Sequence, residues 1–277
     1  MDLDALVAGS RVFDLGRPMF NGMPQSRTHP SYHHALALRH GDRVRADGGS
    51  SAADLVVTGT HVGTHVDAIG HISQHGRLHG GVDARETQRT GALTALGIDA
   101  LPPVVCRGVL LDVPRAVGRD VLDAAYEIAP DELEAAATEQ GTPVRSGDAV
   151  LVRTGWGRYF DDAGAFVGAR TGAPGIGVEA ARWLAERRVR LVGAETLAAE
   201  VVGPGPTHSA LPVHGILLVD HAIHLVEVMD LDELAAAAVH EFVFVMSPLR
   251  LVGATGSPVR PLALSAREPS PRERATM

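Results

Sequence analysis

Short runs of apolar and β-branched residues, separated by turn-forming residues, predict that strands make up much of this chain. Runs this short that end at glycine, proline or aspartate are typical of strands rather than helices. The turn-forming sequence RSGD, which precedes one of them, strengthens that prediction. The stretches with this pattern are 54–62, 104–113, 148–155, 189–195 and 240–253, and a proline divides the last of them into two predicted strands.

Three other stretches, 130–141, 177–188 and 230–242, carry the spacing or the start and stop signals of helices. The first begins with proline and acidic residues and ends at glycine, and the third has acidic residues near its start, where they suit the helix dipole. Helices and strands are interleaved, but strands also occur in adjacent pairs. We therefore predict an α/β fold with a mixed sheet in a single domain, which spans residues 1–265.

The two ends of the chain differ from this pattern. Residues 9–30 hold too many prolines and glycines for a core segment, so we predict a long ordered arm there. Residues 266–277 are charged and contain proline, which predicts a flexible tail.

The composition narrows the classes of partner. The chain has 277 residues, a net charge of −8 and scattered arginines, which argue against nucleic acid. No apolar run approaches the length of a membrane span. The single cysteine, Cys106, excludes an intramolecular disulfide and a cysteine-rich metal site, and it favours a reducing, cytoplasmic location. Because Cys106 lies in an apolar predicted strand, we expect it to be buried and inert. We expect the substrate to be a small molecule.

The chemistry is concentrated in the histidines, of which the chain has fourteen. The stretch GTHVGTHVDAIGH holds His61, His65, Asp67 and His71. On a strand, even offsets place the first three on one face, but four residues of strand span ~13 Å, too far for two imidazoles on one ion. Gly63 lies between the two histidines and can absorb a sharp bend, so a bent strand brings the three side chains together.

Two neutral imidazoles and one carboxylate suit Zn, Mn or Fe(II). Such a set leaves coordination positions open for water and substrate, as a catalytic metal site does. Any one of these histidines taken alone is better explained as a surface or hydrogen-bonding residue. The spaced set of His61, His65 and Asp67, with glycine at the bend, favours a metal site.

A second group of histidines lies in the segment PVHGILLVDHAIHLVEVMDL. His214 and Glu227 flank an apolar run there, and either could complete a mononuclear site or hold a second ion. A carboxylate such as Asp67 could then bridge two metals ~3.5–4 Å apart. Spacing alone does not select these two residues over their neighbours, although His221 and His224 fit packing or surface roles better.

Three aromatic residues follow the predicted strand 148–155. Trp156, Tyr159 and Phe160 could line a pocket that accepts an aromatic substrate. They could equally belong to the core, because aromatic residues make up only 4% of the chain and most of them are expected to be buried.

The motif HVGTHVDAIGH resembles the signature of the cyclase-like metal-dependent hydrolases, a family that includes bacterial kynurenine formamidases and isatin hydrolases. The family pattern is His-x-Gly-Thr-His-x-Asp followed by x-Pro-x-His, and the chain matches it except at the proline, which is Ile69 here. The segment PVHGILLVDHAIHLVEVMDL resembles the family's second ligand segment, which supports His214 and Glu227 as ligands. In VGAETLAAE, Glu195 stands where the family usually has aspartate. The resemblance continues along most of the chain.

The resemblance implies a swivelling β/β/α-type fold that holds one or two divalent ions, with Mn and Zn as the candidates. It implies hydrolysis of an amide, a lactam or a related carbonyl C–N bond. It also implies a homodimer or homotetramer in which the arm 9–30 reaches a neighbouring subunit's pocket. His71 matches the histidine that serves proton transfer in the family.

Elementary chemistry supports the same reaction. A bound metal would lower the pKa of a water molecule to near 7 and polarise the carbonyl group of the substrate. His71 would then act as a general base and afterwards as an acid towards the leaving nitrogen. A further metal ligand is the alternative role for His71.

Two other classes of function remain open at this point. Two histidines and one carboxylate also form the facial triad of non-heme iron oxygenases. His71 and the second group of histidines favour hydrolysis, because acid–base assistance matters more in that reaction. A metal-binding or partner-binding protein without catalytic activity is the other alternative.

Overall fold

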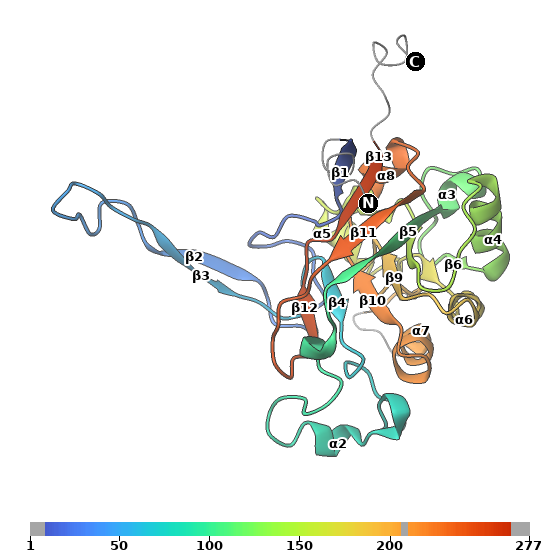
Figure 1. The fold of residues 1–277 in the computed structure, drawn as a ribbon, viewed down its shortest axis with the longest axis horizontal. Coiled ribbons are helices and arrows are strands. Elements are labelled where there is room, and N and C mark those ends of the chain that lie inside the picture. The colour runs from blue at the N-terminus through green and yellow to red at the C-terminus, as the bar shows by residue number, and fades with distance from the viewer. Residues whose placement is uncertain (1–8, 206–209, 267–277) are drawn as a thin grey trace, which may run out of the picture.

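The computed structural model describes residues 9–205 and 210–266. Its centre is a nine-stranded mixed sheet (Figure 1). In their order across the sheet, the strands are β1 (Ser10–Asp14), β13 (Leu262–Ala266), β11 (Glu241–Met246), β5 (Val104–Asp112), β7 (Ala149–Arg153), β9 (Leu191–Ala194), β10 (His224–Glu227), β4 (His65–Asp67) and β12 (Gly256–Pro258).

The parallel strands β5, β7, β9 and β10 form the middle of the sheet, and antiparallel strands flank them on both sides. The helices are α2 (Ala84–Thr87), α3 (Val113–Ala116), α4 (Pro130–Glu139), α5 (Ala163–Val167), α6 (Val178–Glu186), α7 (Pro212–His214) and α8 (Asp232–Ala236). A π-helical segment, Gly215–Asp220, follows α7 directly. A small pair of strands, β6 (Glu127–Ile128) and β8 (Gly175–Ile176), lies outside the main sheet.

Both faces of the sheet are covered, so its central strands are buried on both sides. Side chains alternate along β7: Val150 and Val152 join the core that includes α4 and α6, whereas Ala149 and Leu151 join a second core that includes Leu234 of α8. A mixed sheet between helices in one α/β unit confirms the predicted fold class.

Most of the predicted elements are confirmed. The confirmed stretches are 104–113 as β5, 148–155 as β7, 189–195 as β9, 130–141 as α4, 177–188 as α6 and the first part of 54–62 as the end of a strand, β3.

Two predictions near the C-terminal end are wrong. The helix expected over 230–242 ends at Ala236, because Ala238 has a positive φ of 51° and the following residues pair with β5 as β11. The second half of 240–253 is not a strand, because the chain after Pro248 turns irregularly before it reaches β12. In both places the pairing of distant strands overrides the local pattern.

Residues 9–30, for which we predicted an arm, run along the body of the protein. β1 pairs with β13 at the edge of the sheet, and Phe13 and Leu15 are buried in the core. The element that projects from the body is the next one, a hairpin of β2 (His33–Leu38) and β3 (Ala53–Val57) (Figure 1).

The predicted tail, 266–277, lies outside the described residues apart from Ala266, the last residue of β13. Within the described ranges, no helix has both the length and the apolar character that a membrane crossing requires.

Candidate metal centre

The motif that predicted a metal site lies at β4, near one edge of the sheet. β4 pairs with β10 on one side and β12 on the other, and this register places His65 opposite Glu227. Gly63 makes the predicted bend with a φ of +69°, and His61 before the bend reaches back to the side chains of β4. A Cβ atom on Gly256 of β12 would lie 2.6 Å from Cε1 of His61, so glycine there leaves room for the imidazole.

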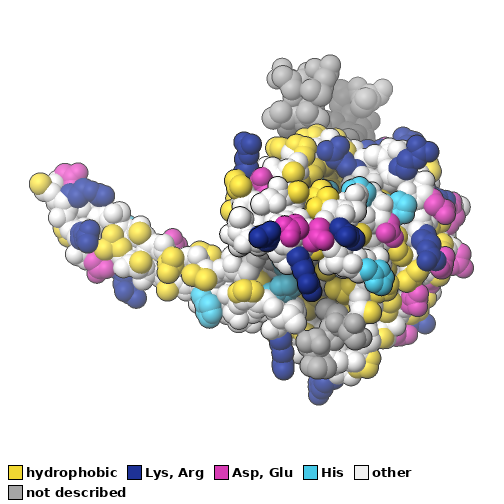
Figure 2. Space-filling view, turned by 90° about the horizontal axis from the view of Figure 1, so that it is seen from below, with side chains coloured by type: hydrophobic (Ala, Val, Ile, Leu, Met, Phe, Trp, Pro, Cys, Tyr) yellow, Lys and Arg dark blue, Asp and Glu magenta, His cyan; other side chains and the backbone are white. Residues whose placement is uncertain are grey.

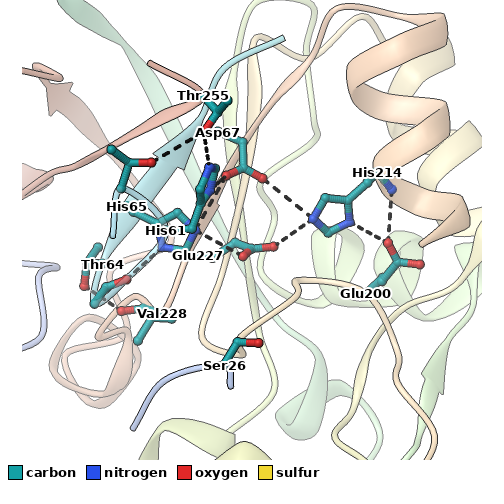
Figure 3. Close-up of polar contacts among 12 residues, drawn as sticks. Ser26, His61, Thr64, His65, Asp67, Glu200, His214, Glu227, Val228 and Thr255 are labelled. Atoms are coloured by element: carbon teal, nitrogen blue, oxygen red, sulfur yellow. Dashed lines mark hydrogen bonds and ion pairs between the residues drawn. The ribbon is translucent and has the colours of Figure 1, made fainter. Parts of the chain in front are cut away.

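Two groups of side chains converge here, and Asp67 belongs to both (Figure 3). In the first group, Nδ1 of His61 lies 2.6 Å from Oδ1 of Asp67, and Nε2 of His65 lies 3.5 Å from the same oxygen. In the second, Nε2 of His214 lies 3.3 Å from Oε1 of Glu227 and 3.7 Å from Oδ2 of Asp67. All five side chains are buried, so the fold brings the five predicted ligand residues together out of water.

Neighbouring acceptors fix the orientation of two of the imidazoles. Nδ1 of His65 donates to the carbonyl oxygen of Gly63 (2.8 Å), and Nδ1 of His214 donates to Oε1 of Glu200 (2.6 Å). In a neutral imidazole the other nitrogen, Nε2, then carries a lone pair. Each Nε2 faces carboxylate oxygens, which are acceptors too, at 3.3–3.7 Å rather than at the 2.7–2.9 Å of a charge-assisted hydrogen bond. The imidazole nitrogens and the carboxylate oxygens therefore face each other as acceptors. A cation between them, either a proton or a metal ion, would satisfy both.

Three buried atoms of the cluster lack a hydrogen-bond partner within the described part of the chain: Nε2 of His65, Oδ2 of Asp67 and Oε1 of Glu227. Buried polar atoms without partners are costly, so such a concentration calls for an explanation. Imidazole nitrogens and carboxylate oxygens are the donors that Zn and Mn accept. The residues present therefore fit a divalent metal ion in the first group, in the second, or in both.

Without a metal, the carboxylates of the cluster favour the protonated forms of His65 and His214. Burial opposes a charge on His214, but the hydrogen bond to Glu200 and the nearby carboxylate of Glu227 outweigh burial and raise the pKa of His214 to about 10. Burial likewise opposes a charge on His65, but Glu227 and Asp67 raise the pKa of His65 above its ordinary value. The pKa of Asp67 is held low in spite of burial, because the surrounding histidines favour its charged form.

Metal binding is therefore expected to release protons and to strengthen as the pH rises. A proton on His214 blocks the nitrogen that a metal would use, and the pKa of about 10 keeps this proton in place at neutral pH in the metal-free protein. The raised pKa of His65 acts in the same direction. Across roughly pH 6 to 8, the affinity for Zn should rise about tenfold per pH unit for each proton displaced. Calorimetric titration in buffers of different ionisation enthalpy counts the protons. An affinity that does not change with pH would contradict this assignment.

His71 lies beside both groups but belongs to neither. Its ring stacks on that of His61 with 3.8 Å between the ring centres, and it lies 6.4 Å from the ring of His214. Burial, helped by the neighbouring histidines and opposed by Asp67, lowers the pKa of His71 to about 4. An imidazole that is neutral at physiological pH can accept a proton, so this position fits the predicted proton-transfer role.

Several residues that the sequence did not single out support the ligands. Glu200 accepts hydrogen bonds from both the backbone nitrogen and Nδ1 of His214. The hydroxyl of Thr255 lies 2.9 Å from Nε2 of His61. His224, for which a packing or surface role was predicted, donates from Nδ1 to the carbonyl oxygen of Asp67 (2.7 Å). Partners of this kind orient the ligands of a metal and tune their basicity.

The aromatic residues proposed for a substrate pocket form a cluster of their own. Trp156 and Phe160 are buried with Phe166, and the indole nitrogen of Trp156 donates to the carbonyl oxygen of Phe166. Tyr159 packs against this cluster and lines, with Trp156, a cavity of about 310 Å³ whose walls include none of the five ligand residues. This placement favours the core role that was the alternative for Trp156 and Phe160.

Four further residues named from the sequence lie away from the ligands. Ile69, at the position of the signature proline, is buried in the core that includes α4 and α6. Glu195 is buried at the end of β9, where its Oε2 accepts hydrogen bonds from the backbone nitrogens of Thr154 and Gly155. His221 is exposed, and Cys106 is half-buried in β5, where burial raises the pKa of its thiol.

Comparison with known proteins agrees with this geometry. The family model for putative cyclases matches residues 13–201, which is more than half of the chain. The chain belongs to the cyclase family. The isatin hydrolase of Roseibium aggregatum is 27% identical to this cyclase over 223 residues, which cover 79% of the chain and 77% of the relative. Cyclase-like protein 3 of Oryza sativa subsp. japonica is 29% identical over 211 residues, which cover 73% of the chain and 61% of the relative.

Solved cyclase structures share the fold. The crystal structure of a novel cyclase superposes with a TM-score of 0.82 at 29% identity and covers 96% of this chain and 94% of its own. Isatin hydrolase A from Ralstonia solanacearum gives a TM-score of 0.72 at 25% identity, with 95% and 97% covered. These matches confirm the resemblance to the cyclase-like hydrolases. This cyclase is a hydrolytic enzyme, and its cluster of imidazoles and carboxylates fits a divalent metal.

Proposed function

We propose that this cyclase hydrolyses the C–N bond of an amide, a lactam or a related carbonyl compound. The observation that carries the proposal is the pair of buried ligand groups that share Asp67, with unsatisfied nitrogen and oxygen atoms turned towards each other. The similarity to an isatin hydrolase supports a cyclic amide as the substrate class. An oxygenase centre needs only two histidines and one carboxylate, so it would leave the second ligand group without a role. The presence of that second group therefore favours hydrolysis over oxygenase chemistry.

The mechanism follows from the places of the side chains. A divalent cation in this centre would polarise the carbonyl group of the substrate and make the attacking water more acidic. His61, His65 and Asp67 would hold the cation in the first group, and His214 and Glu227 would hold it with Asp67 in the second. His71, neutral and stacked on His61, takes the proton that the attacking water loses. His71 then gives that proton to the nitrogen that leaves, so that the amine departs uncharged.

We also propose Zn or Mn as the metal, because the donor set mixes imidazole nitrogens with carboxylate oxygens. Because Asp67 belongs to both ligand groups, the centre is compatible with one bound ion or with two. The single cysteine in the chain supports a cytoplasmic location.

Turnover of a substrate panel tests the proposed reaction. The metal-restored protein is incubated with isatin, formanilide, N-formylanthranilate and a cyclic imide, and ring opening or formate release is followed with and without dissolved oxygen. We expect at least one C–N bond to be cleaved at a rate that does not depend on oxygen. Oxygen-dependent turnover, or no turnover of any carbonyl C–N compound, would refute the proposal.

We infer that the projecting hairpin β2–β3 is covered by a second copy of the chain, in a homodimer or a homotetramer. An isolated two-stranded hairpin is marginally stable in water, so this one needs a partner surface. Its apolar side chains are well exposed: Leu36, Leu55, Val56 and Val57 are between 47% and 60% accessible. Figure 2 shows hydrophobic side chains along the projecting element, away from the body that could cover them.

Replacing Leu55 and Val57 together with glutamate is expected to convert the assembly into monomers. The two residues are two positions apart on β3, so they lie on the same face of the hairpin, and buried glutamates would carry unpaired charges into the contact. Light scattering at micromolar concentration measures the mass, with His33→Gln on the neighbouring strand as the control. A monomeric wild-type protein, or a double variant with unchanged mass, would contradict the hairpin interface.

A further inference from the structure

The loop between β1 and β2, residues 15–32, lies against the segment that carries the metal ligands. The backbone nitrogen of Arg17 donates to the hydroxyl of Thr64, and the backbone nitrogen of Gly59 donates to the carbonyl oxygen of Pro30 (2.8 and 3.2 Å). Both bonds join the loop to the motif that carries His61 and His65. The loop is therefore hydrogen-bonded to the ligand segment near each end of the loop.

The tip of this loop is fixed by its own hydrogen bonds. The side chain of Gln25 donates to the hydroxyl of Ser31 (2.8 Å) and accepts from the backbone nitrogen of Tyr32 (3.1 Å). The backbone nitrogen of His29 donates to the carbonyl oxygen of Ser26 (3.3 Å). These bonds of Gln25 close the tip of the loop, and His29 lies within the closed segment.

The ring of His29 is the next imidazole outward from the ligands. Its centre lies 5.2 Å from the ring centre of His61 and 6.5 Å from that of His71, at tilts of 30° and 42°. His29 is only partly buried, and among the described residues no hydrogen bond to its ring nitrogens is present. It belongs to neither ligand group. His29 therefore offers unused polar atoms at the open side of the cluster.

We propose that His29 is a substrate-binding residue that donates a hydrogen bond to an oxygen atom on the carbon next to the scissile carbonyl. The proposal rests on the proposed hydrolysis and narrows its substrates to amides and lactams with two adjacent carbonyl groups. With the scissile carbonyl at His61, His65 and Asp67, its neighbouring atom would face the ring of His29, whose centre lies 5.2 Å from that of His61. His71, on a different side of His61, stays free for proton transfer.

Matched ligands that differ only in that oxygen test the role. The metal-loaded enzyme is titrated with 2-aminophenylglyoxylate, the ring-opened form of isatin, and with 2-aminophenylacetate, which lacks the keto oxygen. We expect the wild-type enzyme to bind the first about tenfold more tightly, as one hydrogen bond allows. His29→Phe keeps a ring of similar shape but no donor, so it should bind both equally, whereas His29→Gln should restore most of the preference. His221→Phe, at an exposed site, should behave as the wild type.

The outcomes separate this role from others. A preference that survives in His29→Phe, or a wild-type enzyme that binds neither ligand, would overturn the proposal. Loss of bound metal or a lowered melting temperature in His29→Phe would also overturn it, because His29 would then be a ligand or a structural residue. If the wild type shows the His29-dependent preference but cleaves no C–N bond, the proposed hydrolysis fails while the binding role of His29 stands.

Discussion

Replacing Asp67 with asparagine is expected to remove the metal from both ligand groups and to reduce turnover below detection. Asp67 is the carboxylate that belongs to both ligand groups, with Oδ1 towards His61 and His65 and Oδ2 towards His214. Asparagine keeps the size but removes the charge and one acceptor oxygen. Because changes to residues that merely support a ligand already cost about 10–100-fold in metal affinity, loss of this shared ligand should cost more.

Bound metal and turnover are measured on the same sample of Asp67→Asn. The matched control is Asp54→Asn, which removes the same charge at an exposed position on the hairpin, where Asp54 pairs with His34. The control should keep the metal and the activity of the wild type. If Asp67→Asn retained stoichiometric metal and normal turnover, Asp67 would not be the shared ligand.

Replacing His71 with alanine should leave the metal in place and still cost about 10²–10⁴ in turnover. That loss is typical for the removal of a general acid–base group. His71 stacks on a ligand but reaches neither group, and its depressed pKa keeps it ready to accept a proton. Metal analysis and single-turnover kinetics of the same preparation separate this role from ligation.

His61→Ala is the comparison that makes the His71 result interpretable. His61 contacts Asp67 directly and is held from its other side by Thr255, so its loss should remove metal and activity together. If His71→Ala lost metal as readily as His61→Ala, then His71 would be a ligand and proton transfer would have to be assigned elsewhere.

The first ligand group could be predicted because its residues are close together in the sequence. His61, His65 and Asp67 lie within one bend at Gly63, so local geometry alone brings them together. The second group required the family resemblance, because His214 and Glu227 come from a helix and a strand whose relative placement no spacing rule gives.

The residues that support the ligands could not be predicted, because tertiary structure alone joins them to the centre. Thr255 is separated from His61 by 194 residues, and Glu200 reaches His214 from a different loop. His29 likewise comes from a loop that the composition described only as rich in proline and glycine. No local pattern distinguishes a threonine or glutamate with such a role from one at the surface.

The fold shows the same division between local and distant effects. The central strands follow their sequence patterns, because strands that are buried on both faces of a sheet are continuous apolar runs. The helices α4 and α6 also follow theirs. The helix expected over 230–242 stops early because β11 pairs with β5 and β13. The apolar and β-branched residues before the metal motif predicted a strand, but not that the strand leaves the sheet as part of a projecting hairpin.

Titration of metal into chelator-treated enzyme, with isatin ring opening measured at each point, tests the central claim most directly. The claim is that the cluster around Asp67 binds a divalent ion that is required to cleave a carbonyl C–N bond. We expect no turnover in the metal-free protein and a rate that rises in proportion to bound Zn or Mn until the ligand groups are full. Full turnover in protein that holds no metal would contradict the account.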